Sequence, residues 1–225
     1  LAAGIDEDVR VDWEVIEYVG PVGGPWEFEV IARANKRLNP AVFTGSTSIA
    51  GLSSDYSKVV AVGTGVTSGA TGASWGDASV ALGIDTSSGS ELITAQRSVA
   101  ASTTNVTYCA VDFLGSAWSV QAVSHTFSSA GADETETVTD VGAWSRAFIF
   151  STYRAAGAGL DECAANVWPG STTTSVRFRL RSGASTSLAA VEAFVVSASS
   201  GLAVEHQDSI TGGGTDHSSA ANTTT

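Results

Sequence analysis

The stretch Asp55–Val62, DYSKVVAV, is followed 88 residues later by Ala143–Phe150, AWSRAFIF. In both stretches an aromatic residue, a serine and a cation precede four apolar residues that suit β-strands, in the same order. Repetition within a chain has to be examined before single motifs, because the repeat determines the architecture. The pair therefore predicts a chain built from repeated β units.

Three further sets of segments repeat in a constant order. They are a strand-like segment that ends in an acid and an aromatic in its first two copies (Val11–Tyr18, Val106–Phe113, Ala189–Val196), a segment that follows a glycine-containing turn (Trp26–Arg33, Trp118–His125, Leu202–Asp208), and an arginine–serine pair (Arg97–Ser98, Arg181–Ser182). The spacing between copies varies from 95 to 83 residues, as insertions and deletions in loops around a constant set of strands would produce.

These landmarks divide the chain into units of about 90 residues. Residues 1–32 are the last strands of a preceding unit, 33–122 and 123–208 are complete units, and 209–225 form a flexible tail or the start of a further unit. Gly, Ala, Ser and Thr dominate and Met is absent, which favours strands and turns over helices. The expected fold is all-β, with tandem antiparallel β-sandwich modules and little or no helix.

Apolar runs between turn residues predict six strands in each complete unit. They lie near 41–49, 58–63, 79–84, 92–97, 104–113 and 118–124 in the first unit, and near 134–141, 146–152, 164–168, 175–181, 188–196 and 202–206 in the second. Within the strand Ser175–Arg181, three arginines alternate with Phe178 and Leu180, as in a strand packed on one face only. The arginine face would either bind an anion or meet carboxylates of this acidic chain.

The formal net charge is −12, from 23 acidic and 11 basic residues. Such a chain repels phosphates, so nucleic acid is not an expected partner. There is no run of 18 apolar residues, and no membrane span is expected. The chain starts in the middle of a strand-like pattern and without Met, which we interpret as a piece of a longer protein or a processed product.

The two cysteines, Cys109 and Cys163, are too few for a disulfide framework and too far apart for a CxxC motif. Cys109 lies in the middle of an expected strand, where a small buried side chain is the simplest interpretation. A bridge between the two would join neighbouring units and would indicate an oxidising location.

Two motifs suggest catalysis or cofactor binding. Gly72–Gly76, GASWG, matches the nucleophile elbow around Ser74, but an elbow needs a helix after the serine and a strand is expected at 77–84. The glycines of 63–69 are spaced one residue too widely for a dinucleotide-binding loop and lack a βαβ context. No catalytic or cofactor-binding residue is therefore assigned, and we expect a protein that is not an enzyme and has no cofactor.

Acidic residues cluster at 5–8, 132–136 and 160–162. These clusters would either donate oxygens to Ca²⁺ or form solvated loops, and none has the spacing of an EF-hand. The three histidines, His125, His206 and His217, are scattered. No metal ligand is assigned, and the residues that bind any other ligand are not determined by the sequence.

The segment VDWEVIEY at Val11–Tyr18, echoed at Val106–Phe113, resembles the strand that ends each module in β-repeat proteins of tailed-phage fibres and large secreted bacterial surface proteins. The third copy departs from the pattern because Val195 stands where the acid is expected. The resemblance implies a fibre of antiparallel sandwiches. In length and order the units are also similar to the H-type lectin module, but the sugar-binding residues of that family map onto no position here.

Two function hypotheses follow. The first is a non-enzymatic building block of an extracellular, cell-surface or virion fibre that self-associates through sheet edges or aromatic-bearing faces. The alternative is a carbohydrate-binding adhesin module in which Trp75 or Trp144 stacks on sugar rings. For both tryptophans the competing interpretation is burial at the start of a strand.

Overall fold

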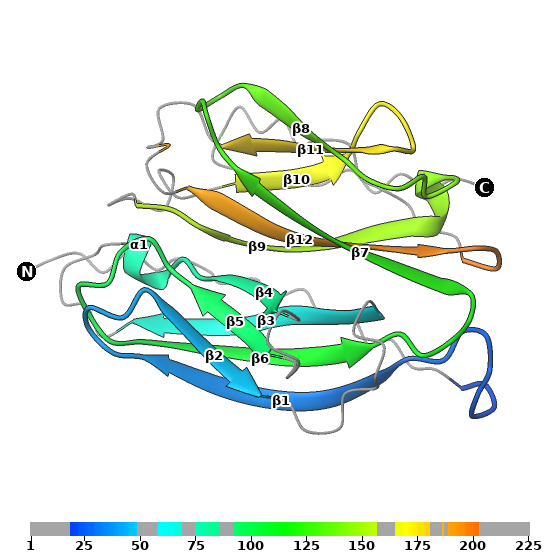
Figure 1. Ribbon diagram of the computed structural model, residues 1–225, viewed down its shortest axis with the longest axis horizontal. Helices are drawn as coiled ribbons and strands as arrows, with labels where there is room; N and C mark the ends of the chain where they lie inside the picture. Colours follow the sequence, from blue (N-terminus) through cyan, green and yellow to red (C-terminus); the bar gives the residue numbers. More distant parts are fainter. Residues whose placement is uncertain are drawn as a thin grey trace, which may run out of the picture.

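The computed structural model describes residues 19–48, 58–68, 75–85, 92–156, 165–180, 186 and 189–202. These residues form twelve strands, which pair as four antiparallel sheets of three strands each (Figure 1). The described residues contain one α-helical turn, α1 (Trp75–Ala78), one 3₁₀ turn, η2 (Trp144–Arg146), and Lys58 in 3₁₀ conformation before β3. The predicted all-β fold is therefore confirmed. No helix in this part of the chain is long and apolar enough to cross a membrane.

The first six strands form two sheets, and we call them the first set. Sheet A has the order β1-β6-β3 and sheet B the order β2-β5-β4. The bounds are β1 (Glu29–Leu38), β2 (Thr44–Ser48), β3 (Val59–Ser68), β4 (Ala81–Asp85), β5 (Leu92–Gln96) and β6 (Thr104–Asp112).

The last six strands form the second set, which lies over the first in Figure 1. Sheet C has the order β7-β12-β9 and sheet D the order β10-β11-β8. The bounds are β7 (Trp118–Thr126), β8 (Asp133–Thr137), β9 (Ala147–Arg154), β10 (Ala165–Pro169), β11 (Ser175–Leu180) and β12 (Ala190–Ala198).

The strand orders of the two sets are equivalent. In each set the first strand pairs with the sixth and the sixth with the third, while the second pairs with the fifth and the fifth with the fourth. The repeated stretches that open the sequence analysis lead into β3 and β9, and the other two strand-like landmarks fall on β1 and β7 and on β6 and β12. A repeated module would produce this correspondence.

The pairing groups two strands differently from the sequence analysis. The sequence landmarks place the strand expected at 118–124 in the first unit, but β7 pairs with β12 and belongs to the second set. Likewise β1 begins at Glu29, before the expected boundary at residue 33, and pairs with β6. Sequence similarity located both strands, but only the ladder of hydrogen bonds shows which sheet each one joins.

The arginine–serine landmark does not preserve the face of its strand. A spacing of 84 residues aligns Ile93 and Ala95, which are buried, with Arg177 and Arg179, which lie on the outer face of sheet D. Successive side chains of a strand point to opposite faces. A spacing of 84 residues therefore aligns inward-facing residues with outward-facing ones, and the alignment is off by one residue. Its second copy, residues 181–182, lies outside the described residues.

Arg97 joins three connections of the first set at one corner. Its guanidinium donates to the carbonyl oxygens of Asn39 (2.6 Å) and Val42 (2.9 Å), which lie between β1 and β2. It also donates to the carbonyl oxygen of Ser102 (2.7 Å) and to Oγ1 of Thr104 (2.8 Å), where the chain passes from β5 to β6. All three connections pass between sheets A and B.

The counter-charge comes from the third connection, between β3 and β4. Asp77 of α1 is buried, and its Oδ1 lies 3.7 Å from the Arg97 guanidinium. The same oxygen accepts the N–H of Ala101 (3.0 Å), and the carbonyl oxygen of Asp77 accepts the hydroxyl of Thr104 (2.6 Å). Burial lowers the pKa of Arg97 and Asp77 opposes this, so the buried charge is paired and hydrogen-bonded as burial requires.

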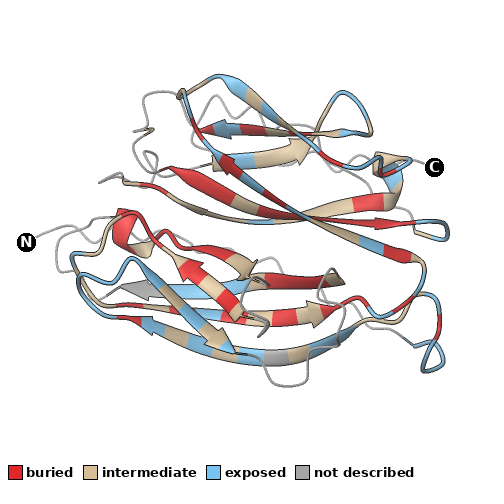
Figure 2. Cartoon of the chain, viewed as in Figure 1, coloured by how far each residue is buried: buried red, intermediate tan, exposed pale blue. Residues whose placement is uncertain are grey.

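Strand β12 is buried on both faces (Figure 2). Val191 and Val195 belong to the core between sheets C and D, whereas Phe194 and Val196 point the other way into the core of the first set. The sequence AVEAFVVSA is nearly continuously apolar, as expected for a strand that is covered on both sides. Strand β12 therefore contributes to the hydrophobic cores of both sets, and the two sets pack directly against each other.

Three glycine-containing turns that repeat in the sequence lie side by side. They are residues 20–25, 115–117 and 199–201, and backbone hydrogen bonds of 2.8 to 3.0 Å join the second turn to the region of the other two. A Cβ at Gly115 would lie 2.2 Å from the carbonyl oxygen of Pro25, so this close approach requires glycine.

Aromatic side chains fill the junction beneath these turns. Trp26 and Trp118, which occupy equivalent positions before β1 and at the start of β7, meet edge to face with ring centroids 5.7 Å apart. Phe113 contacts Trp118 at 5.2 Å, Phe28 at 5.9 Å and Phe148 at 6.2 Å. Such pairs add to the free energy of burial, so this cluster holds the two sets together.

Replacing Arg97 by Met should destabilise the protein by about 3 to 5 kcal/mol, because Asp77 would stay buried without its counter-charge. The free energy of unfolding, measured by urea denaturation, tests this. Arg37→Met is the matched control: Arg37 is exposed and donates a hydrogen bond to the side chain of Asn39, so its loss should cost less than about 1 kcal/mol. Equal effects of the two substitutions would refute the structural role of Arg97.

Because β12 belongs to both cores, the two sets should unfold in one cooperative transition. Phe194→Ala should lower the free energy of unfolding by about 3 to 5 kcal/mol and shift the whole transition. Tryptophan fluorescence and far-UV circular dichroism, followed in one urea titration, should give coincident curves. Two resolved transitions, only one of which is shifted by the substitution, would contradict the conclusion that β12 belongs to both cores.

Candidate functional site

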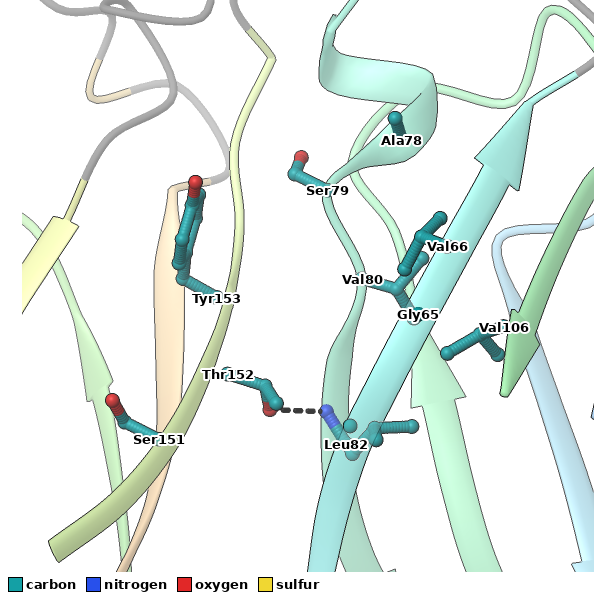
Figure 3. Close-up of a pocket in the computed structure, with 11 residues that line it drawn as sticks. Gly65, Val66, Ala78, Ser79, Val80, Leu82, Val106, Ser151, Thr152 and Tyr153 are labelled. Carbon is teal, nitrogen blue, oxygen red and sulfur yellow. Dashed lines mark hydrogen bonds between the residues drawn. The ribbon is translucent and has the colours of Figure 1, made fainter. Parts of the chain in front are cut away.

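A cleft of about 260 Å³ lies between the two sets (Figure 3). One wall is formed by β3 at Gly63, Gly65 and Val66 together with residues 78–80 and Leu82, and the other by Ser151–Tyr153 of β9. Sheet C thus covers the side of the first set where strands β3 and β4 form the edges of their sheets. This cleft is where a ligand would meet both sets.

The hydroxyl groups beside the cleft bind backbone of the opposite set. Thr152 of β9 points toward β4, and its Oγ1 accepts the N–H of Leu82 at 2.7 Å (Figure 3). Ser79 accepts the N–H of Ala155 at 3.0 Å and lies 3.2 Å from its carbonyl oxygen. The two hydroxyl groups form hydrogen bonds with backbone groups at strand edges that sheet pairing leaves unpaired. They therefore hold the two sets together and are not available to a ligand.

A half-buried carboxyl group continues this polar contact. Glu192 of β12 lies opposite Ser124, which donates to it at 2.5 Å, and a Cβ on Gly83 would come within 3.8 Å of its side chain. Burial raises the pKa of Glu192 above the ordinary 4.5, while the hydrogen bond from Ser124 and the charge of Arg154 oppose the rise. The contact between the sets is therefore apolar at the aromatic end and polar here.

His125 lies in the second set and is enclosed by structural partners. It stacks on Phe178 with ring centroids 4.6 Å apart. Nδ1 lies 2.8 Å from a carboxylate oxygen of Glu136, and Nε2 lies 3.2 Å from one of Glu134, although without hydrogen-bond geometry. Burial by itself would raise the pKa of Glu134, but hydrogen bonds from Ser128 and Ser129 hold it below its ordinary value. The ring is therefore buried between Phe178 and two carboxylates, and only Nδ1 has a hydrogen-bond partner.

The acidic cluster at 132–136 forms strand β8 and is not a solvated loop. Glu134 and Glu136 face His125, and Asp133 on the other face pairs with Arg177 and, at 3.8 Å, with Arg179. The expectation that the arginines of this face meet carboxylates is confirmed for Arg177 and Arg179. Within the described ranges no three His, Cys, Asp or Glu side chains are grouped so as to hold a metal ion.

Of the two tryptophans proposed to stack on sugar rings, the structure describes the side chain of only one. Trp144 packs against the core of the second set and donates its indole N–H to the carbonyl oxygen of Thr172 at 2.9 Å. The side chain of Trp75 lies outside what the structure describes. Sequence analysis missed Trp168, which lies on the outer face of sheet D with Arg177 stacked 5.1 Å from its ring centre. In the sequence, the signal for an outward-facing Trp168 is that it follows the apolar Val167, because neighbouring residues of a strand point to opposite faces.

Ser74 of the elbow-like motif lies outside the described residues. The strand expected at 77–84 is wrong at its start, because α1 occupies Trp75–Ala78 and β4 begins only at Ala81. Asp77 explains the turn, since its carboxylate is needed beside Arg97. A single turn is too short to be the helix of a nucleophile elbow.

Cys109 is a half-buried free thiol in the middle of β6, and burial raises its pKa while Arg33 opposes the rise. The proposed partner Cys163 lies outside the described residues. So do the other sites suggested by sequence, namely the acidic clusters at 5–8 and 160–162, Arg181, His206 and His217.

Replacing Glu192 by Gln should change how stability depends on pH. Because the folded-state pKa is raised, the contribution of Glu192 is fully present below the unfolded pKa and is lost as pH rises through the folded pKa. The variant stays neutral, so its stability relative to the parent should increase as pH rises through this window. Urea denaturation at a series of pH values measures this, with Glu29→Gln on exposed β1 as the control. A constant difference at all pH values would contradict the assignment.

The described residues thus join the two sets of strands by aromatic packing at one end and by hydroxyl-to-backbone hydrogen bonds at the other. Comparison with protein-family models, with curated proteins and with solved structures finds no match to this chain.

Proposed function

We propose that this chain is a non-enzymatic structural repeat protein of an extracellular, cell-surface or virion fibre, and that it self-associates through its β modules. One observation carries the proposal: two consecutive sets of six strands have the same order, and a sheet of the second covers the open side of the first. In repeat proteins each unit is stabilised mainly by its neighbours, which suits an elongated load-bearing assembly.

The chemistry of the charged groups supports a structural function. Arg97, Asp77, His125 and Asp133 each have protein partners that stabilise a corner or a sheet. Catalytic sites instead gather groups whose hydrogen bonds are completed by substrate. The hydroxyls beside the cleft between the sets satisfy edge backbone, which favours a rigid contact over a binding pocket.

A carbohydrate-binding module is the alternative, and the outer face of sheet D is the surface to test. Trp168 and Arg177 stack there beside the exposed Asn166 and the acceptor Asp133, a combination of ring and polar groups that suits a sugar. A glycan array would detect such binding, and its loss in Trp168→Ala would favour the lectin hypothesis.

The fibre proposal predicts that the full chain forms oligomers or filaments as its concentration rises. Sedimentation velocity from low to high micromolar concentration, followed by negative-stain electron microscopy, should show species larger than the monomer. A monomer at every concentration and salt tested would count against the proposal.

A further inference from the structure

The edge strands of the four sheets differ in how they are protected. An edge strand carries unpaired N–H and C=O groups, and proteins usually protect it with charges, proline, a bulge or a covering segment. Each sheet here has two edge strands. Strands β3, β4 and β9 meet in the contact between the two sets, so their edges are covered. Strand β10 ends in Pro169, and β8 has the acidic sequence DETET.

The edges of the first set on its other side are protected by cations. Strand β1 has a break in register between Val30 and Ala32 and carries the exposed Arg33. Strand β2 is only five residues long, and the ammonium group of Lys36 donates to the carbonyl oxygen of Ser46 at 2.6 Å. Both features hinder pairing with a further strand.

Strand β7, at the edge of sheet C, has no protection of this kind among the described residues (Figure 1). It is nine residues long, and its pairing with β12 runs from Trp118 to Thr126 without a break in register. Its sequence WSVQAVSHT contains no Asp, Glu, Lys, Arg or Pro, and the side chain of His125 is buried. The edge is therefore long, regular and without an exposed charged group.

The surroundings of β7 leave this edge accessible. The exposed residues of the strand are Ser119, Ala122, Ser124 and Thr126. Ala122 is exposed although its partner in β12, Phe194, is buried, so the first set covers β12 here and does not extend over β7. Within the described chain, the backbone of residues 119–126 forms hydrogen bonds only with β12. Gln121 contacts Thr139 through its side chain, which leaves the edge backbone unpaired.

The charge of the chain indicates which strand can occupy the edge. Each copy has a formal net charge of −12, so two copies repel each other at long range. Pairing β8 or β1 with itself would set like charges opposite each other, whereas pairing β7 with itself would not. Antiparallel pairing centred on Ala122 sets this small side chain opposite itself and Ser124 opposite Val120 of the other copy. A second copy of the chain is therefore a fitting occupant.

We infer that β7 of one copy pairs antiparallel with β7 of a second copy, about a two-fold axis at Ala122. The pairing joins the two three-stranded C sheets into one continuous sheet, with β7 of each copy at its centre. The same strand contributes from both sides, so the contact is isologous and closes at two copies. The inference rests on the proposed structural function, and it names the strand through which copies associate.

A charge introduced at this edge tests the contact. Ala122→Lys sets two ammonium groups opposite each other at the axis, so it should weaken dimerisation by about tenfold or more in sedimentation equilibrium. Asn35→Lys is the matched control, because Asn35 is an exposed, uncharged residue in the middle of β1, the corresponding edge of sheet A. The control should dimerise like the parent. Circular dichroism and thermal melts confirm that both variants are folded.

A cysteine at the same position tests the register. Opposite Cβ atoms of an antiparallel pair lie about 4.5 to 5.5 Å apart, from which a small adjustment brings two cysteines into disulfide geometry. Under mild oxidation Ala122→Cys should therefore form a covalent dimer, and peptide mass mapping should locate the bond between the two copies of position 122. Asn35→Cys, treated in the same way, should form no bond between two copies of position 35.

Hydrogen–deuterium exchange distinguishes a second copy from other occupants of the edge. The β7 amides that do not donate to β12 should exchange rapidly in the monomer and become protected as the concentration rises through the range of dimerisation. If these amides are already protected in the monomer, another segment of the same chain pairs with β7, and the proposal is overturned.

The failures of the two proposals are distinguishable. A parent chain that never associates removes the structural function itself, and this contact with it. A parent that associates while Ala122→Lys associates equally well leaves that function standing and overturns the assignment of β7. Loss of association in Ala122→Lys, without a disulfide at position 122 in Ala122→Cys, would overturn the two-fold pairing centred on Ala122.

Discussion

The buried guanidinium of Arg97 is the constraint on which the first set depends. Three connections must turn from sheet A to sheet B at one corner, and turns of this kind expose carbonyl groups that no ladder can satisfy. One planar group with five donors reaches carbonyls in two of these connections and the carboxylate of Asp77 in the third. The corner is therefore held by a charge that has a partner in every segment it joins.

The second set depends instead on strand β12, which packs on both of its faces. It is the middle strand of sheet C, and its two faces contribute to two cores. Its near-continuous apolar sequence fits this position, whereas the alternating pattern of β11 fits a strand with one wet face. The position of each strand in the stack can thus be understood from how many of its faces are apolar.

The contact between the sets combines two kinds of interaction. At one end aromatic rings around Trp118 provide burial, and at the other Thr152 and Ser79 satisfy the backbone of edges that sheet pairing leaves open. Unpaired edges invite association with other chains, and covering them with a neighbouring sheet is one way to prevent this.

Much of the fold was predictable from sequence. Alternation of apolar residues and the positions of glycine-containing turns located the strands, because these signals act between residues close in the chain. The recurrence of Trp26 at Trp118 and of Val106–Phe113 at Ala189–Val196 marks strands that occupy the same places in the two strand orders.

The rest was decided by contacts between residues far apart in the sequence. The pairing of β7 with β12, the corner formed by Arg97 with Asp77, the enclosure of His125 by two glutamates and the stacking of Arg177 on Trp168 all required tertiary structure. Sequence alone determined that the fold is all-β, roughly where most of its strands lie, and that the pattern recurs. Only the fold decided which sheets meet and which polar groups are thereby occupied, because a charged side chain finds its partner across strands whose register and stacking no local pattern encodes.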